Sequence, residues 1–114
     1  MIEISEKLAE QKTDFYDDGF LRIEYNNYYV TWNGKILKPT RAEFLILSRL
    51  VQMSERFVSS EELWEIVWGH GKKFNSESMR VYMYHLRRLL EPLGMNIENM
   101  VFVGYRFIPY KKSS

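Results

Sequence analysis

The clearest chemistry in this sequence lies on one predicted helix. Arg80, Tyr84 and Arg87 are spaced i, i+4 and i+7, so they share one face of an α-helix. An α-helix fits the major groove of DNA, where each base pair shows its own pattern of donors, acceptors and methyl groups. Arginine can hold a guanine through two hydrogen bonds, and tyrosine can bond to a phosphate or a base. This spacing therefore predicts a face that reads duplex DNA.

Other polar residues extend this face or flank the helix. Lysines and arginines outside the face are suited to phosphates, which contribute affinity and register but little sequence information. The candidate DNA-binding residues are Ser78, Arg80, Tyr84, His85, Arg87, Arg88, Lys72, Lys73 and Arg106. In an arbitrary sequence a basic helix face is more often solvated, with its arginines paired to glutamates. The order of the neighbouring elements favours the DNA-reading alternative here.

The helix that carries these residues has clear boundaries. Asn75 and Ser76 are both good N-terminal caps, and Pro92 forces an end near Leu90. Apolar residues at i, i+4, i+7 and i+11 form one seam, which consists of Met79, Met83, Leu86 and Leu90. With this seam turned inward, the basic and polar residues are left outside.

The first part of the chain predicts a small antiparallel sheet. Residues 20–25 alternate apolar and polar side chains, and residues 28–32 are rich in aromatic and β-branched types. Asn33-Gly34 is a strong two-residue hairpin signal, because both residues tolerate positive φ. Residues 35–38 then form the return strand.

Two further helices are predicted between this sheet and the DNA-reading helix. Thr40 with Glu43 forms a capping box, and this helix should run to about Ser54. Ser59 with Glu62 forms a second capping box. Each cap precedes an apolar stripe with helical spacing, so both segments are expected to pack into one core.

The end of the chain predicts a hairpin, which completes the fold. Apolar runs at 97–103 and 105–108 flank Gly104. We expect an α+β fold, a winged helix-turn-helix with an N-terminal antiparallel β-sheet, a three-helix core and a C-terminal β-hairpin wing. The expected divisions are an acidic extension or linker at 1–18, the DNA-binding domain at 19–110 and a frayed tail at 111–114.

Composition agrees with one DNA-binding domain. The chain has 114 residues and a net charge of +1, but the charge is unevenly distributed. Residues 1–24 carry −4, residues 25–69 are balanced and residues 70–114 carry +5. The positive charge therefore gathers in the part that holds the candidate helix and hairpin, as expected for a surface that meets phosphates.

Several other classes of protein are disfavoured. The absence of cysteine excludes disulfides, thiolate catalysis and zinc fingers, and is compatible with the cytoplasm. No apolar run is long enough for a membrane span, and the N-terminus has no signal-peptide pattern. Two histidines without carboxylates at ligand spacing argue against a metal site. No Gly-rich phosphate loop or Ser-His-Asp set is present, so we expect no enzyme, no catalytic residue and no cofactor.

Several short motifs, in this order and spacing, are typical of one family. They are 37–47 (Leu-Lys-Pro-Thr-Arg-Ala-Glu-Phe-Leu-Ile-Leu), 56–63 (Arg-Phe-Val-Ser-Ser-Glu-Glu-Leu), Val67-Trp68-Gly69, Leu86-Arg87-Arg88-Leu89-Leu90 and Gly104-Tyr105-Arg106-Phe107. The chain resembles the winged-helix effector domains of OmpR/PhoB-type response regulators of two-component systems, over about residues 20–108. The resemblance implies a four-stranded N-terminal sheet and transcriptional control by promoter binding. It also implies that the loop at 69–75 contacts RNA polymerase, and a homodimer on the DNA is a further expectation.

The chain departs from the family pattern at three places. Family members usually carry a receiver domain, and nothing of that size fits in residues 1–19, so this is either an excised effector domain or a stand-alone regulator. Tyr84 and His85 stand where paired arginines are frequent. Val101 and Phe102 stand where the wing usually has an Arg-Gly pair whose arginine enters the minor groove.

These departures leave two functions open. The first is sequence-specific binding of double-stranded DNA by a cytoplasmic bacterial transcriptional regulator. The second is a protein–protein interaction module with weak or no DNA binding, in which the apolar wing contacts a partner. Phe102 and Trp68 are the candidate partner-binding residues, although Trp64 and Trp68, spaced i, i+4, are more often core residues.

Overall fold

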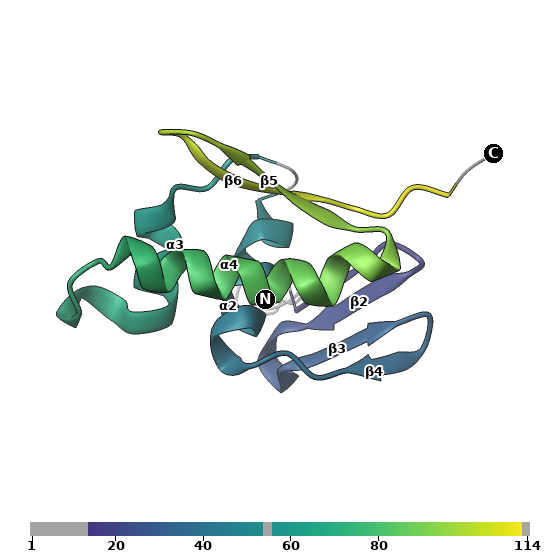
Figure 1. Ribbon diagram of the computed structural model, residues 1–114. Helices are drawn as coiled ribbons and strands as arrows, with labels where there is room; N and C mark the ends of the chain where they lie inside the picture. The colour runs from purple at the N-terminus through teal and green to yellow at the C-terminus, as the bar shows by residue number, and fades with distance from the viewer. Residues whose placement is uncertain (1–13, 54–55, 113–114) are drawn as a thin grey trace, which may run out of the picture. The chain divides into compact units, whose positions relative to one another are not determined.

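The computed structural model describes residues 14–53 and 56–112. These residues belong to two compact units, 1–38 and 39–114, which Figure 1 shows in one view. The first unit contains the sheet, and the second contains the helices and the hairpin. No helix among the described residues is long and apolar enough to cross a membrane.

The described residues of the first unit form a four-stranded antiparallel sheet with the strand order β1-β2-β3-β4. Its elements are β1 (Phe15–Asp17), β2 (Leu21–Glu24), the 3-10 turn η1 (Tyr25–Asn27), β3 (Tyr29–Trp32) and β4 (Lys35–Leu37). Leu21 and Ile23 are buried on one face of β2, and Ile23 pairs in register with buried Val30 of β3. The predicted turn at Asn33-Gly34 is confirmed, with both residues at positive φ.

The strand β1 was not predicted, because it precedes residues 20–25, whose alternating pattern predicts the start of the sheet. It pairs with β2 through Phe15, Tyr16 and Asp17, inside the stretch 1–18 that we expect to be an extension. β1 is a short edge strand with both ends exposed, so it has no buried alternating pattern from which it could be recognised. The four strands agree with the number that the resemblance implies.

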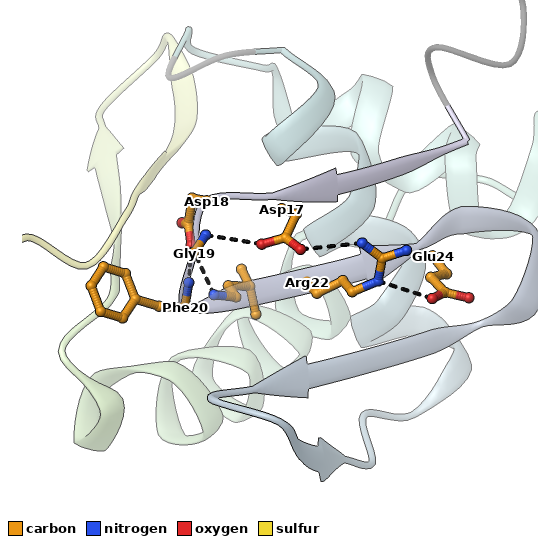
Figure 2. Close-up of polar contacts among 7 residues, drawn as sticks. Asp17, Asp18, Gly19, Phe20, Arg22 and Glu24 are labelled. Atoms are coloured by element: carbon orange, nitrogen blue, oxygen red, sulfur yellow. Dashed lines mark hydrogen bonds and ion pairs between the residues drawn. The ribbon is translucent and has the colours of Figure 1, made fainter.

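Two aspartates build the connection between β1 and β2 (Figure 2). Asp17 accepts a hydrogen bond from the backbone N–H of Gly19 at 2.9 Å, and Asp18 accepts one from Phe20 at 2.9 Å. Arg22 then lies between two carboxylates, 3.1 Å from Asp17 and 2.9 Å from Glu24. The backbone bond from Gly19, followed by the Arg22 contact, lowers the pKa of Asp17 below its ordinary value of 3.8.

The lowered pKa of Asp17 makes the free energy of unfolding depend on pH. A carboxyl group with a lower pKa in the folded state contributes stability above its unfolded pKa, and this contribution is lost as the pH falls through the folded value. We expect acidification from pH 7 to below pH 3.8 to lower the free energy of unfolding less in Asp17→Asn than in the unaltered chain. Urea unfolding of both chains at the two pH values measures this. Equal losses in the two chains would contradict the role of Asp17.

In the part of the second unit that the structure describes, three helices are followed by a two-stranded hairpin. Its elements are α2 (Arg41–Gln52), α3 (Ser60–Trp68), η2 (Gly69–Gly71), α4 (Ser76–Leu90), η3 (Glu91–Leu93), β5 (Asn96–Met100) and β6 (Gly104–Ile108). Buried residues of α2, α3, α4 and the hairpin form its core. Among them are Phe44, Leu47, Leu50, Leu63, Trp64, Met79, Met83, Leu86, Ile97 and Phe107. This arrangement confirms the predicted winged helix-turn-helix order.

The predicted caps position the helices, with two differences. Thr40 and Glu43 form the full capping box of α2, which ends at Gln52, before the expected Ser54; Ser54 lies outside the described residues. Ser59 accepts the N–H of Glu62 as predicted. Among the described residues the return bond of that second box is not made, and the carboxylate of Glu62 lies 3.8 Å from Arg49.

The hairpin is fixed to the segment between α2 and α3. Val58 and Tyr105 exchange two backbone hydrogen bonds, of 2.8 and 2.9 Å. Gly104, at the start of β6, has φ +149°, and a Cβ atom built on it would lie 2.1 Å from the carbonyl oxygen of Val58. Only glycine allows this close approach of the two backbones, so Gly104 sets the position of the wing.

Candidate nucleic-acid interface

The side of α4 that carries the candidate residues is exposed. The predicted seam of α4 is confirmed, because Met79, Met83, Leu86 and Leu90 are all buried. Asn75 caps the helix by accepting the N–H of Ser78 at 2.9 Å. Along the opposite side Arg80, Tyr84 and Arg88 are exposed, so their side chains are available to an external ligand.

Arg80 differs from the other arginines of this helix in its surroundings. Its side chain is exposed and makes no hydrogen bond or ion pair with any residue that the structure describes. Arg88 instead donates from Nη1 to the Tyr84 hydroxyl at 3.1 Å. The Tyr84 ring lies 5.5 Å from the His85 ring, centroid to centroid. The N-terminal half of the face therefore offers one free guanidinium, and the C-terminal half offers a connected polar cluster.

Arg87 is held by the hairpin, although it shares helical spacing with Arg80. Its Nε and Nη2 atoms both donate to the backbone oxygen of Ile97, at 3.1 and 3.0 Å. Its guanidinium carbon lies 6.0 Å from the centre of the Tyr105 ring. The half-buried Arg87 thus connects α4 to β5 and contributes to the placement of the wing.

The loop between α3 and α4 is organised by two tryptophans. Trp64 is buried and donates its indole N–H to the backbone oxygen of Lys72 at 2.9 Å. The ammonium of Lys72 lies 3.9 Å from the centre of the Trp68 ring. Trp68 is 38% exposed, so one of the paired tryptophans is a core residue and the other is part of the surface. Lys73 is exposed in the same loop.

Arg106 is engaged within the wing. Its guanidinium forms an ion pair with Glu98 across the β5–β6 ladder and lies 4.6 Å from the centre of the Phe57 ring. A phosphate would have to compete with Glu98 for this guanidinium. The charge of Arg106 is therefore largely balanced inside the wing.

The tip of the wing is apolar and exposed. It consists of Met100, Val101, Phe102 and Val103, here called the wing tip. Phe102 is fully exposed and Val101 is 68% exposed. Val101 and Phe102, the departure noted in the wing, thus lie exposed at the end of the hairpin.

Two hollows border α4 within this unit. One, of about 420 Å³, is lined by residues that include Ser76 and Arg80 of α4 together with Asn99, Val101 and Phe102 of the wing. The other, of about 580 Å³, is lined by Arg41, Val67, Trp68, Val81, Tyr82 and His85 among others. Arg80 therefore lies beside the wing tip, whereas His85 lies beside the exposed tryptophan.

Val81 is a surface residue that the selection of polar side chains overlooked. It follows Arg80 directly and is 50% exposed. Its position relative to the seam could have revealed it, because it is two residues, or about 200°, away from buried Met79. A valine here can contact a thymine methyl group, which is how apolar side chains take part in base reading.

The described part of the chain contains no cluster of three or more His, Asp or Glu side chains that could hold a metal ion. The two histidines belong to different surroundings. His70 lies 3.5 Å from Glu65, and His85 contacts Tyr84.

Comparison with known proteins identifies the family. The family model described as "Transcriptional regulatory protein, C terminal" matches residues 34–107. RpaA of Synechocystis sp. (strain ATCC 27184 / PCC 6803 / Kazusa), described as a DNA-binding dual master transcriptional regulator, is 32% identical over 84 residues. That match covers 74% of this chain and 35% of RpaA. The chain spans less than half of the length of the curated relatives that it matches.

Solved structures share the fold. The response regulator DrrB, a Thermotoga maritima OmpR/PhoB homolog, aligns with a TM-score of 0.74 at 25% identity, over 93% of this chain and 49% of DrrB. The Klebsiella pneumoniae RstA DNA-binding domain, solved in complex with the RstA box, aligns with a TM-score of 0.69 at 23% identity. That alignment covers 84% of this chain and 98% of the RstA domain.

This chain belongs to the OmpR/PhoB-type family of C-terminal domains of transcriptional regulatory proteins, a class of winged-helix DNA-binding domains. The predicted family and fold are confirmed. The family is not a class of enzymes.

Proposed function

We propose that this domain binds double-stranded DNA at a specific sequence, with the exposed face of α4 in the major groove, as part of a bacterial transcriptional regulator. The observation that carries the proposal is the free guanidinium of Arg80 on a helix whose opposite side is wholly buried. A free arginine on a rigid helix can approach a guanine edge without first breaking an internal bond.

We assign the contacts according to what each side chain already binds. Arg80 reads a base, and Val81 lies against a thymine methyl group. Tyr84, His85 and Arg88 bond to bases or phosphates as one cluster. Ser78, which is half-buried, lies six residues before Tyr84, nearer the start of the helix. Lys72 and Lys73 face phosphates, which position the domain on the duplex.

Arg87 and Arg106 have a different part in this proposal. Both guanidinium groups are occupied inside the protein, by the Ile97 carbonyl and by Glu98. Arg87 retains Nη1 for a phosphate, while Nε and Nη2 hold the hairpin. We therefore expect Arg87 mainly to hold the wing beside α4 and Arg106 mainly to hold the two strands of the wing together, with any contact to DNA a secondary role.

A second surface favours a protein contact. The hollow beside Trp68 brings this exposed tryptophan together with Arg41, and aromatic residues and arginine are enriched at protein interfaces. It adjoins the loop at 69–75. We propose RNA polymerase as the partner of this region, a homodimer on the DNA as the bound form and the cytoplasm as the location.

Salt dependence tests the DNA-binding proposal. Duplexes are selected from a random pool with the unaltered chain, and the dissociation constant of a selected duplex is measured at about 50 and 200 mM salt. We expect affinity to fall about 100-fold if about four phosphates are neutralised. We also expect an unselected duplex to bind at least about 1,000-fold more weakly at the higher salt. Failure to bind any duplex at the lower salt would refute the proposal, and equal affinity for all duplexes would refute its specificity.

A further inference from the structure

The wing tip presents a large apolar side chain on a strained, well-held turn. The N–H of Val103 donates to the backbone oxygen of Met100 at 2.9 Å, which closes the turn. Phe102, inside it, has φ +67°, a left-handed conformation that bulky residues rarely adopt. Glycine or asparagine would be easier to accommodate there. Stability therefore does not explain the phenylalanine, and an observed outlier of this kind points to a function.

The wing tip adjoins the DNA-reading part of α4. Arg80 and Ser76 of α4 line the same hollow of about 420 Å³ as Val101 and Phe102. Figure 1 shows the turn between β5 and β6 on the same side as the N-terminal end of α4. A duplex that contacts Arg80 in its major groove thus has its neighbouring backbone and minor groove close to the wing tip.

The chemistry of the wing tip is suited to an apolar contact with DNA. Its four residues carry no charge, and Arg106, the arginine of β6, is paired with Glu98. The tip of the wing therefore has no charged side chain that could pair with a phosphate. Apolar side chains such as phenylalanine can instead enter the minor groove and push between base steps, which partly unstacks them and bends the duplex.

We propose that Phe102 enters the minor groove of the bound duplex as an apolar wedge between two base pairs. Its preferred site is a flexible pyrimidine–purine step, because such steps unstack most easily. This inference rests on the proposed function. It assigns to the wing a contact that depends on shape and deformability of the DNA, and not on charge.

A contact with a second copy of the chain fits these observations less well. A stable interface requires about 800 Å² from each partner, whereas the apolar tip consists of four residues at the end of a hairpin. A projecting aromatic side chain fits a narrow groove better than a broad flat surface.

Replacement of Phe102 by glycine separates DNA binding from folding. Glycine accepts φ +67° without strain, so Phe102→Gly should unfold at an equal or higher temperature than the unaltered chain. It should nevertheless bind the selected duplex about tenfold more weakly, as is typical when an aromatic contact with a base is lost. Because no cation is removed, the loss should be the same at both salt concentrations. Ile36→Ala, which shortens another exposed apolar side chain, is the control and should leave affinity unchanged.

The bend of the duplex gives a second measurement. Fluorophores at the two ends of the selected duplex report its bend, and 2-aminopurine placed at the pyrimidine–purine step proposed for the wedge reports unstacking. Compared with the complex of the unaltered chain, the Phe102→Gly complex should have a straighter duplex and weaker 2-aminopurine fluorescence, because the base is stacked again. The Phe102→Trp complex should keep both the bend and the fluorescence of the unaltered complex.

The possible results distinguish this inference from the proposed function. Unchanged affinity and bend in Phe102→Gly, while Arg80→Ala weakens binding, would overturn the wedge and leave DNA binding standing. A change in sedimentation of the free protein on Phe102→Gly, with the DNA signals unaltered, would assign the tip to a protein contact and overturn the wedge. If no duplex binds to the unaltered chain, the proposed function and the wedge both fail.

Discussion

Replacing Arg80 with alanine is expected to weaken binding to the selected duplex by roughly 10- to 100-fold and to relax specificity at one base pair. An arginine that bonds to a guanine edge contributes about 1–3 kcal/mol of discrimination. Arg80 is exposed and has no described partner, so its removal should change the free energy of unfolding by less than about 0.5 kcal/mol. Competition with duplexes mutated at each position measures the specificity, and urea unfolding measures the stability.

Arg87→Ala is the matched control, because it removes the same side chain from the same helix. Arg87 donates two bonds to the Ile97 carbonyl, and a hydrogen bond from a charged group contributes about 1.5–3 kcal/mol where it is shielded from water. Since Arg87 is only half-buried, we expect a loss of about 1 kcal/mol in unfolding free energy. We expect weaker binding without relaxed specificity. The assignment of Arg80 to a base would be wrong if Arg80→Ala weakened all duplexes equally.

Replacing Gly104 with alanine is expected to lower the free energy of unfolding by about 3 kcal/mol or more. The added Cβ would lie 2.1 Å from the Val58 carbonyl oxygen, and the φ of +149° is itself unfavourable for alanine. Each such strain costs on the order of 1–3 kcal/mol. Relief requires the wing to move away from Val58, which would break the two backbone hydrogen bonds between Val58 and Tyr105. DNA affinity should fall with the displaced wing.

Gly71→Ala is the control for this substitution. No atom lies within 4 Å of a Cβ atom built on Gly71, so its unfolding free energy should change by less than about 0.5 kcal/mol. Urea unfolding of the three chains, at equal protein concentration, measures the difference. Similar stabilities for the two variants would show that the wing has room for the extra methyl group, contrary to its described position.

Most elements of the fold could be predicted from local patterns. Thr40, Ser59 and Asn75 are found as the caps of their helices, because capping depends on residues three positions apart. Pro92 stands two residues after Leu90, the last residue of α4, because proline cannot continue a helix. β1 could not be predicted in this way, because this three-residue edge strand has no buried alternating pattern and forms only by pairing with β2.

The candidate site was predictable as a face, but not residue by residue. Spacing places Arg80 and Arg87 on the same side of the helix, yet only Arg80 is free, because a strand later in the chain offers Arg87 a backbone carbonyl. Arg106 is likewise engaged by a partner that spacing does not reveal, because its ion pair with Glu98 forms only when the two strands of the hairpin pair. Trp64 and Trp68 are spaced as one pair, but their burial differs.

The sequence by itself determined the order of elements, the buried seam of α4 and the basic character of the last part of the chain. These features depend on side-chain type and on spacings of a few residues, which act locally. Only the tertiary structure decided which arginine is free, how Gly104 meets Val58 and that Phe102 stands exposed at positive φ. The first two features arise when groups from segments far apart in the sequence meet, and no local pattern specifies such a meeting. The third depends on how the turn between Met100 and Val103 closes and on what the rest of the fold leaves uncovered.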